Sequence, residues 1–116
     1  MSVLEVESVP RNFDPSRLAS SIVIPGHLLV YGFTVYSSNG AAQYALMFDD
    51  VSLPADAAVP ITPLDLPSKQ LRGVSWTPQG REFLGGFVLC NSSTDTYKTI
   101  GAADCFFDVQ YDRLPD

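Results

Sequence analysis

Few side chains in this chain could carry out chemistry, and its single histidine, His27, limits the choice most. Zinc sites draw their ligands from Cys, His and carboxylates, and the chain has neither a Cys-x-x-Cys pair nor a second histidine. A serine or cysteine nucleophile would need His27 as its base. Because His27 follows the turn pair Pro25-Gly26, we interpret it as a surface turn residue. We predict no catalytic residue, no cofactor and no metal site.

Carboxylates alone could support hydrolysis, because two of them cleave glycosides when they are held about 5 to 9.5 Å apart. Asp49 and Asp50 are adjacent, and consecutive strand residues point to opposite faces. A hydrolase would therefore pair Asp108 with Asp49 or Asp104, although a structural or interface role for Asp108 is the interpretation we favour. Calcium at Asp49, Asp50 and Asp56 is a further alternative, without EF-hand spacing.

The two cysteines, Cys90 and Cys105, lie in apolar surroundings in separate expected strands. A disulfide between neighbouring strands is conceivable. The first residues lack the basic segment and apolar run of a signal peptide, so we expect the chain to be made and kept in a cytoplasm, where thiols stay reduced. We therefore favour two buried free thiols.

Aromatic residues make up 11% of the chain, and Trp76 and Tyr97 are among those expected to reach solvent. Exposed aromatic rings can stack on sugar rings, so Trp76 and Tyr97 are candidate ligand-stacking residues of a carbohydrate-binding module. Core packing and subunit contacts use the same residue types, and we favour that second explanation.

The composition predicts one globular domain, since 46% of the 116 residues are hydrophobic and the formal net charge is -6. This apolar content disfavours intrinsic disorder, and the acidic balance disfavours nonspecific nucleic-acid binding, which needs clustered positive charge. No apolar stretch approaches the ~18 residues of a membrane span. We expect neither a nucleic acid nor a membrane as partner.

Strand patterns separated by Gly, Pro, Asn and Asp follow one another from Ser21 onward, and no window has a helical period. Residues 28–37 and 43–49 are the clearest strands, and the turn residues between them predict that Gln43–Asp49 pairs with Tyr31–Tyr36 as an antiparallel hairpin. The prolines of residues 59–67 predict an edge strand or an extended crossover. Gly85-Gly86 predicts a bulge or a close backbone approach.

Roughly seven or eight strands with no covering helix must bury their apolar faces against one another. We therefore predict an all-β fold, an antiparallel two-sheet β-sandwich of jelly-roll or immunoglobulin-like type, over residues 20–116. Residues 1–19 lack a strand or helix period and form an expected extended N-terminal arm, whose apolar groups need a partner. The candidate residues for contact with a neighbouring subunit or another partner in this arm are Val3, Leu4, Val6, Val9, Arg11, Phe13, Arg17 and Leu18.

Six segments form a set of turns and strand ends that define the fold: Ala42–Asp49, Leu53–Asp56, Val59-Pro60, Gly80–Phe83, Gly86–Ser93 and Lys98–Asp104. Through these segments, residues 20–112 resemble small β-sandwich virion proteins of tailed bacteriophages. The resemblance implies a noncatalytic cement or decoration protein on the outer capsid surface, binding the major capsid protein. It also implies self-association, with a homotrimer as the expected form, and a virion location after synthesis in the cytoplasm of a host bacterium. The alternative is a β-sandwich module on the phage head or tail that binds a carbohydrate or a host receptor.

Overall fold

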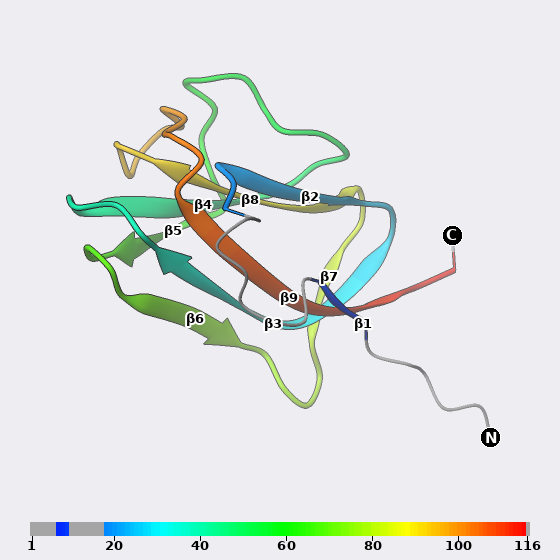
Figure 1. Ribbon diagram of the computed structural model, residues 1–116. Coiled ribbons are helices and arrows are strands. Elements are labelled where there is room, and N and C mark those ends of the chain that lie inside the picture. Colours follow the sequence, from blue (N-terminus) through cyan, green and yellow to red (C-terminus); the bar gives the residue numbers. More distant parts are fainter. Residues whose placement is uncertain (1–6, 10–17, 116) are drawn as a thin grey trace.

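The computed structural model describes residues 7–9 and 18–115, and every regular element in them is a β-strand (Figure 1). These residues contain no helix that is long and apolar enough to cross a membrane. The strands are β1 (Glu7–Val9), β2 (Ser21–Pro25), β3 (Leu28–Ser37), β4 (Gln43–Asp49), β5 (Thr62–Leu66), β6 (Leu71–Ser75), β7 (Arg81–Phe83), β8 (Gly86–Ser92) and β9 (Cys105–Arg113).

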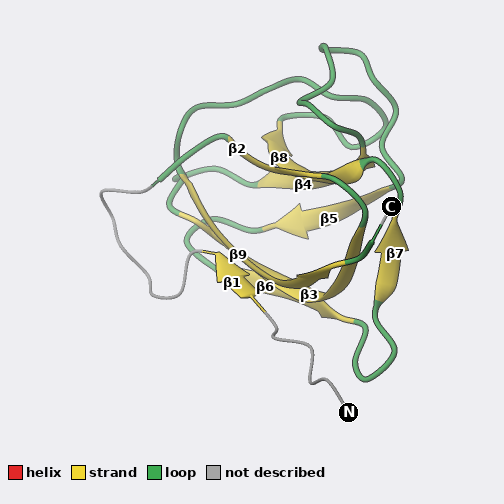
Figure 2. Cartoon of the chain, turned by 90° about the vertical axis from the view of Figure 1, so that its right-hand side faces the viewer, coloured by secondary structure: helices red, strands yellow, loops and turns green. Residues whose placement is uncertain are grey.

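The strands form two antiparallel sheets that face each other (Figure 2). Sheet 1 has the order β1-β9-β3-β6, with β7 also paired to β3, and sheet 2 has the order β2-β8-β4-β5. The expected all-β class with two antiparallel sheets is confirmed. The chain passes repeatedly from one sheet to the other, so that most neighbours within a sheet are distant in sequence.

The predicted hairpin between β3 and β4 is wrong, although both strands have the predicted bounds. β3 lies in sheet 1, where β9 takes one edge and β6 and β7 share the other. β4 lies in sheet 2 between β5 and β8. The segment between them crosses from one sheet to the other, because each strand buries one apolar face in the space between the sheets.

The main core lies between the two sheets, and Phe33, Phe83, Phe87 and Leu28 are among its large residues with an exposed fraction of 3% or less. The Phe83 and Phe87 rings meet edge to face, with centroids 5.1 Å apart. A second cluster of Leu46, Phe48, Val88 and Cys90 lies on the outer face of sheet 2. The β4–β5 loop covers this cluster with Leu53 and Ala58.

Two local predictions from proline and glycine are confirmed. β5 is an edge strand, as the prolines require, and Pro63 is paired with Leu46. At Gly86 the chain passes from sheet 1 to sheet 2 with φ +152°, and a Cβ there would lie 2.4 Å from the Asp50 carbonyl oxygen and 2.8 Å from that of Ile24. Only glycine fits so close to two backbone carbonyls.

Part of the expected arm belongs to sheet 1. Glu7–Val9 forms β1, which pairs with Val109–Tyr111 of β9, and Ala19 forms a bridge with Cys105. Strand pairing therefore occurs in a segment whose sequence shows no strand period. The remainder of the arm lies outside the described residues, except for Leu18, which is half-buried.

Candidate functional site

The predicted stacking residues are not brought together. Trp76 follows β6 at the edge of sheet 1, is half-buried, and packs with ring centroids 5.8 Å from Phe33 and 6.3 Å from Phe83. Tyr97 lies in the β8–β9 loop and is 46% exposed. Trp76 is mainly a packing residue at the rim of the core, and the ligand-stacking role of Trp76 and Tyr97 stays a prediction.

Of the predicted arm contacts, Val3, Leu4, Val6, Arg11, Phe13 and Arg17 lie outside the described residues. Val9 is the last residue of β1, where its backbone is paired with Val109. Leu18 precedes the Ala19 bridge to β9. The capsid-contact role of all eight residues stays a prediction.

His27 joins the β2–β3 turn to two other segments. Its Nε2 bonds to the Glu82 carboxylate, and its Nδ1 lies 3.0 Å from the carbonyl oxygen of Pro115. Glu82 is the outward-facing residue of β7, so this contact holds the turn against sheet 1. These contacts fix the end of the sandwich.

The two cysteines are buried free thiols, as expected. Cys105 belongs to the core between the sheets, whereas Cys90 belongs to the cluster on the outer face of sheet 2. Burial raises the pKa of Cys90 to about 11 and, with the Asp104 carboxylate beside it, that of Cys105 to about 12. Neither thiol therefore has the lowered pKa of a reactive cysteine.

The carboxylates of the hydrolase alternative lie apart. Asp108, the acid common to both predicted pairs, lies in β9 of sheet 1, opposite Thr34. Asp49 ends β4 in sheet 2 and accepts bonds from the backbone N–H groups of Leu84 and Gly85. Asp104 lies four residues before Asp108, about 13 Å along an extended chain, and its carboxylate is bonded to Asn39, Gln43 and Asn91.

The calcium alternative gains no support from the carboxylate positions. Asp56 is paired with Lys98, and Asp49 caps the backbone at the β7–β8 junction. Within residues 7–9 and 18–115, no three His, Cys, Asp or Glu side chains gather as metal ligands.

Asp104 is the centre of a polar cluster at one end of the sandwich, and sequence reasoning missed this role. Its carboxylate accepts side-chain bonds from Asn39 at 2.9 Å, Asn91 at 2.9 Å, Gln43 at 3.1 Å and the Cys105 thiol at 3.2 Å. Desolvation alone would raise the pKa of Asp104, but these donors together lower it. The cluster ties the β3–β4 crossover, both sheets and the start of β9 together.

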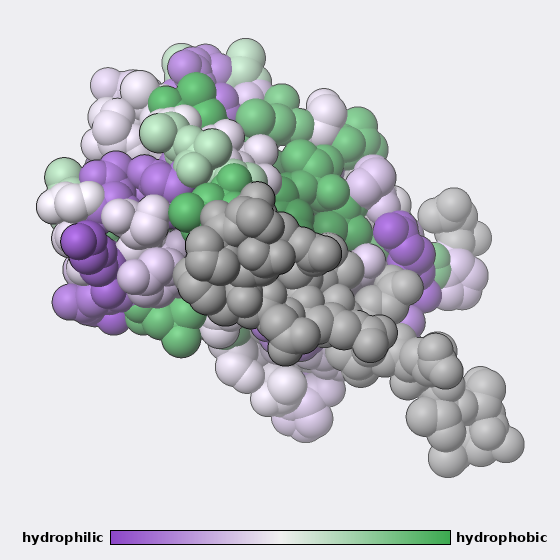
Figure 3. All heavy atoms as spheres, in the orientation of Figure 1, coloured by the Kyte–Doolittle hydropathy of each residue, from purple (hydrophilic) through white to green (hydrophobic). Residues whose placement is uncertain are grey.

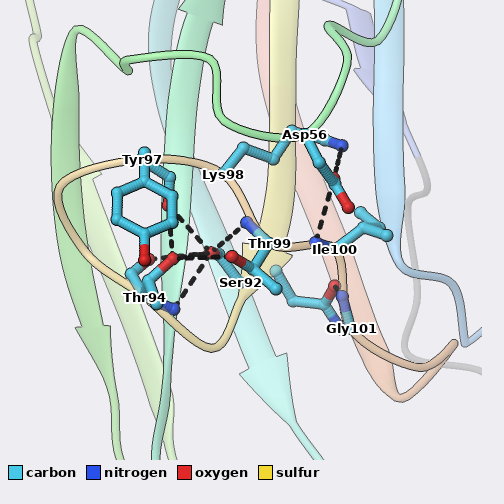
Figure 4. A network of polar contacts seen from close by, with 9 residues as sticks. Asp56, Ser92, Thr94, Tyr97, Lys98, Thr99, Ile100 and Gly101 are labelled. Atoms are coloured by element: carbon cyan, nitrogen blue, oxygen red, sulfur yellow. Dashed lines mark hydrogen bonds and ion pairs between the residues drawn. The ribbon is translucent and has the colours of Figure 1, made fainter.

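Lys98 fastens the β8–β9 loop to the β4–β5 loop above sheet 2 (Figure 4). Its side chain is 4% exposed, and its Nζ donates to Asp56 Oδ1 at 2.6 Å. The Lys98 bond, followed by the Ile100 N–H, lowers the pKa of Asp56. Below this pair, Ser92 Oγ accepts from the Thr99 N–H at 2.9 Å. The two loops are therefore bonded to each other where they cover the outer cluster of sheet 2.

Hydrophobic surface remains beside these loops. Figure 3 shows apolar residues gathered on the face of the molecule over β2, and Val23 of β2 is only half-buried. The exposed fraction is 61% for Val51, 77% for Val59 and 44% for Ile61, all in the β4–β5 loop, and 71% for Leu84. Exposed apolar side chains of this kind are typical of contact sites.

A groove of about 530 Å³ lies on the outer face of sheet 1. Tyr31 lies in it together with four residues whose side chains can form hydrogen bonds, Thr34, Ser75, Thr77 and Gln110. We call these five residues the outer groove. The floor of the groove is open because it contains two glycines, Gly32 of β3 and Gly73 of β6, which have no side chains. The paired strands approach closely at this point, and a Cβ on Gly73 would lie 2.7 Å from the Phe33 carbonyl oxygen.

The outer groove is the strongest candidate for a small-molecule contact on sheet 1. An aromatic ring beside several hydroxyl and amide groups can hold a flat polar ligand such as a sugar. This groove is a different candidate site from the one predicted at Trp76 and Tyr97, because neither residue lines it. Strict alternation would place Tyr31 and Thr34 on opposite faces of β3, and a register shift between Val30 and Gly32 brings both to the outer face. This shift and the glycines that open the groove can be recognised only from the pairing of β3 with its neighbours.

Comparisons with protein-family models, with curated proteins and with solved structures give no match.

Proposed function

We propose that this chain is a noncatalytic structural protein of a tailed-bacteriophage virion, a cement or decoration protein on the outer capsid surface. The observation that carries the proposal is the strand order. β1 pairs with β9, β2 with β8, β3 with β6, and β4 with β5. These nested pairs are those of one long hairpin rolled into two sheets, which favours the jelly roll over the immunoglobulin-like alternative.

A jelly roll is an architecture of viral capsid and lectin domains, so the fold is consistent with the sequence resemblance to phage virion proteins. Fold alone does not assign a function. Here the two supports are independent, because the resemblance comes from turns and strand ends and the pairing comes from the arrangement in space.

Attachment requires surfaces that bury apolar side chains on another protein. The β4–β5 loop carries the exposed side chains of Val51, Val59 and Ile61. The Lys98–Asp56 bond holds this loop in place, so part of the entropy cost of ordering the loop is met before binding. Each apolar side chain that becomes fully buried contributes about 1.5 to 3 kcal/mol before ordering costs. A homotrimer would engage three such surfaces at once and gain from multivalency.

The test is a rebinding assay on capsids stripped of this protein. A double substitution, Val59→Ser with Ile61→Ser, should weaken rebinding at least about tenfold, since it removes two exposed apolar contacts. The matched control is Leu71→Ser, which removes an apolar side chain that is 58% exposed on sheet 1. Equal rebinding by the double variant and the original chain would refute attachment through this loop.

The arm prediction needs a narrower deletion than residues 1–19, because Glu7–Val9 is a strand of sheet 1. Deleting residues 2–6 removes Val3, Leu4 and Val6 and leaves β1 in place. We expect this variant to keep its unfolding midpoint and to lose capsid rebinding. Unchanged rebinding would remove the anchoring role of these residues. Sedimentation of the original chain tests the trimer.

The outer groove favours one second candidate, a module that binds a host carbohydrate. Tyr31 would stack on a sugar ring, while Gln110 and Thr34 would bond its hydroxyl groups. On a glycan array, Tyr31→Ala and Gln110→Ala should both abolish specific binding, and Tyr97→Ala, outside the groove, should not. An array without any specific signal for the original chain would exclude this candidate.

A further inference from the structure

A second recess opens between the two sheets and is lined by residues of both. It lies on the side where β5 and β6 form the sheet edges, and these two strands can be followed in Figures 1 and 2. Its volume is about 310 Å³, at the lower end of the range for ligand pockets. Its inner wall consists of core residues with an exposed fraction of 3% or less: Phe33, Ala45, Met47 and Leu89. The recess therefore reaches from the surface into the main core. We call it the edge cavity.

Arg81 lies at the mouth of the edge cavity, on the face of β7 that carries apolar side chains toward the core. β7 alternates, with Phe83 paired to Leu28 and Arg81 paired to Val30, and both Leu28 and Val30 are core residues. Arg81 therefore faces the space between the sheets, whereas Glu82 faces outward to His27. Its guanidinium lies 5.7 Å from the centre of the Trp76 ring.

The contacts of the Arg81 guanidinium are with aromatic rings. Among the residues that the structure describes, the Arg81 side chain makes no ion pair, and its contacts are with the Trp76 and Phe83 rings. The walls of the edge cavity contain no Asp or Glu, and Thr62 of β5 adds a hydroxyl group. A chain with a formal net charge of -6 thus has a positively charged entrance to an apolar cavity.

We propose that the edge cavity binds a small amphipathic anion, a medium-chain alkyl carboxylate, with its hydrocarbon tail against Met47, Ala45 and Leu89 and its carboxylate on Arg81. Alkyl chains fit a wall of aliphatic and aromatic side chains, and a guanidinium offers paired donors to a carboxylate. The Trp76 ring holds the guanidinium by a cation–π contact, so that Arg81 is oriented before the ligand arrives. This activity is independent of the virion proposal.

The probe is octanoate, and the chain reports on it directly because Trp76 is its only tryptophan. Titration up to about 10 mM would detect a Kd of about 1 mM. We expect a saturable change in Trp76 fluorescence and, with methyl-labelled methionine, a shift of the Met47 methyl signal, which is assigned by Met47→Leu. No saturable change in either signal would overturn the proposal.

Two arginine variants separate charge recognition from nonspecific adsorption. Arg81→Gln should weaken octanoate binding about tenfold or more, measured by calorimetry because the variant alters the surroundings of Trp76. Arg72→Gln removes the same charge from the same edge of the sandwich but outside the cavity, and binding should be unchanged. Equal weakening in both variants, or no weakening in Arg81→Gln, would refute the assigned site.

A neutral ligand and a filled cavity complete the test. Octan-1-ol has a tail of the same length without the carboxylate, and we expect it to bind about tenfold or more weakly than octanoate. Leu64→Trp places a large ring in the wall contributed by the edge strand β5, where Leu64 is only half-buried. This variant should keep its fold and lose the Met47 shift. Retained binding would place octanoate elsewhere and overturn the proposal.

Discussion

Replacing Asp104 by alanine tests whether one carboxylate holds the end of the sandwich. The substitution removes the acceptor of side-chain bonds from Asn39, Gln43 and Asn91. Gln43 keeps a bond to Ser37 Oγ at 2.9 Å, so its amide group remains partly satisfied. Asn91 is fully buried, and one of its N–H groups is left without an acceptor. The loss therefore falls mainly on Asn91.

An orphaned buried donor costs about 1 to 3 kcal/mol, and the lost bond to the partly exposed Asn39 costs less, about 0.5 to 1.5 kcal/mol. We therefore expect Asp104→Ala to lower the free energy of unfolding by about 3 kcal/mol. The assay is urea unfolding followed by Trp76 fluorescence at neutral pH. Asp95→Ala, an exposed carboxylate of the same loop, is the matched control and should stay within about 0.5 kcal/mol of the original chain.

The same comparison has a pH dependence with a fixed sign. The pKa of Asp104 in the folded chain is lowered from its ordinary value of 3.8, so the unfolded chain binds a proton at higher pH than the folded one does. Asp104 therefore stabilises the folded chain fully at pH values above 3.8, and this stabilisation is lost as the pH falls through the lowered pKa of the folded chain. The difference between the original chain and Asp104→Ala should shrink on acidification. A loss below about 1 kcal/mol at neutral pH would refute the reasoning.

Three further predictions concern other parts of the fold. Gly86→Ala should lower the free energy of unfolding in urea by about 2 kcal/mol or more, because a Cβ at this position meets two backbone carbonyls. Its control is Gly40→Ala, which has open space around it and should be neutral or slightly stabilising. Asp56→Ala should lower the urea midpoint more than Lys98→Met, since it leaves a buried amine without its acceptor; the reverse order would contradict the fastening role. The two cysteines should react with a thiol reagent at pH 8 far more slowly in the folded chain than in urea, because burial raises their pKa; equal rates would contradict that burial.

Local patterns predicted the strands well and the partners of those strands poorly. The alternation of apolar residues places β3 and β4 at their observed bounds, and the prolines place β5 at an edge. The turn residues between β3 and β4 indicate correctly that the chain reverses there. They carry no information on whether the returning strand joins the same sheet or the opposite one, and in a sandwich both choices bury the same face.

The sites that sequence reasoning missed depend on contacts between distant segments. Asp104 and its partners Asn39 and Gln43 are 65 and 61 residues apart, so no local spacing connects them. The position of Arg81 was accessible in principle, because alternation around Glu82 places it on the same face as Phe83. Alternation alone does not show that this face lies beside the edge of the opposite sheet, so it could not place Arg81 at the mouth of the edge cavity.

The nested strand pairs also set the order in which the chain can assemble. β4 and β5 are close in sequence, whereas β1 and β9 join residues about a hundred positions apart, as in the pair of Glu7 with Tyr111. Loop closure over longer segments costs more entropy, and ladders between distant strands slow folding to about milliseconds or seconds. We expect the roll to close from its innermost ladder outward, with β1 docking last and exchanging its amide hydrogens first.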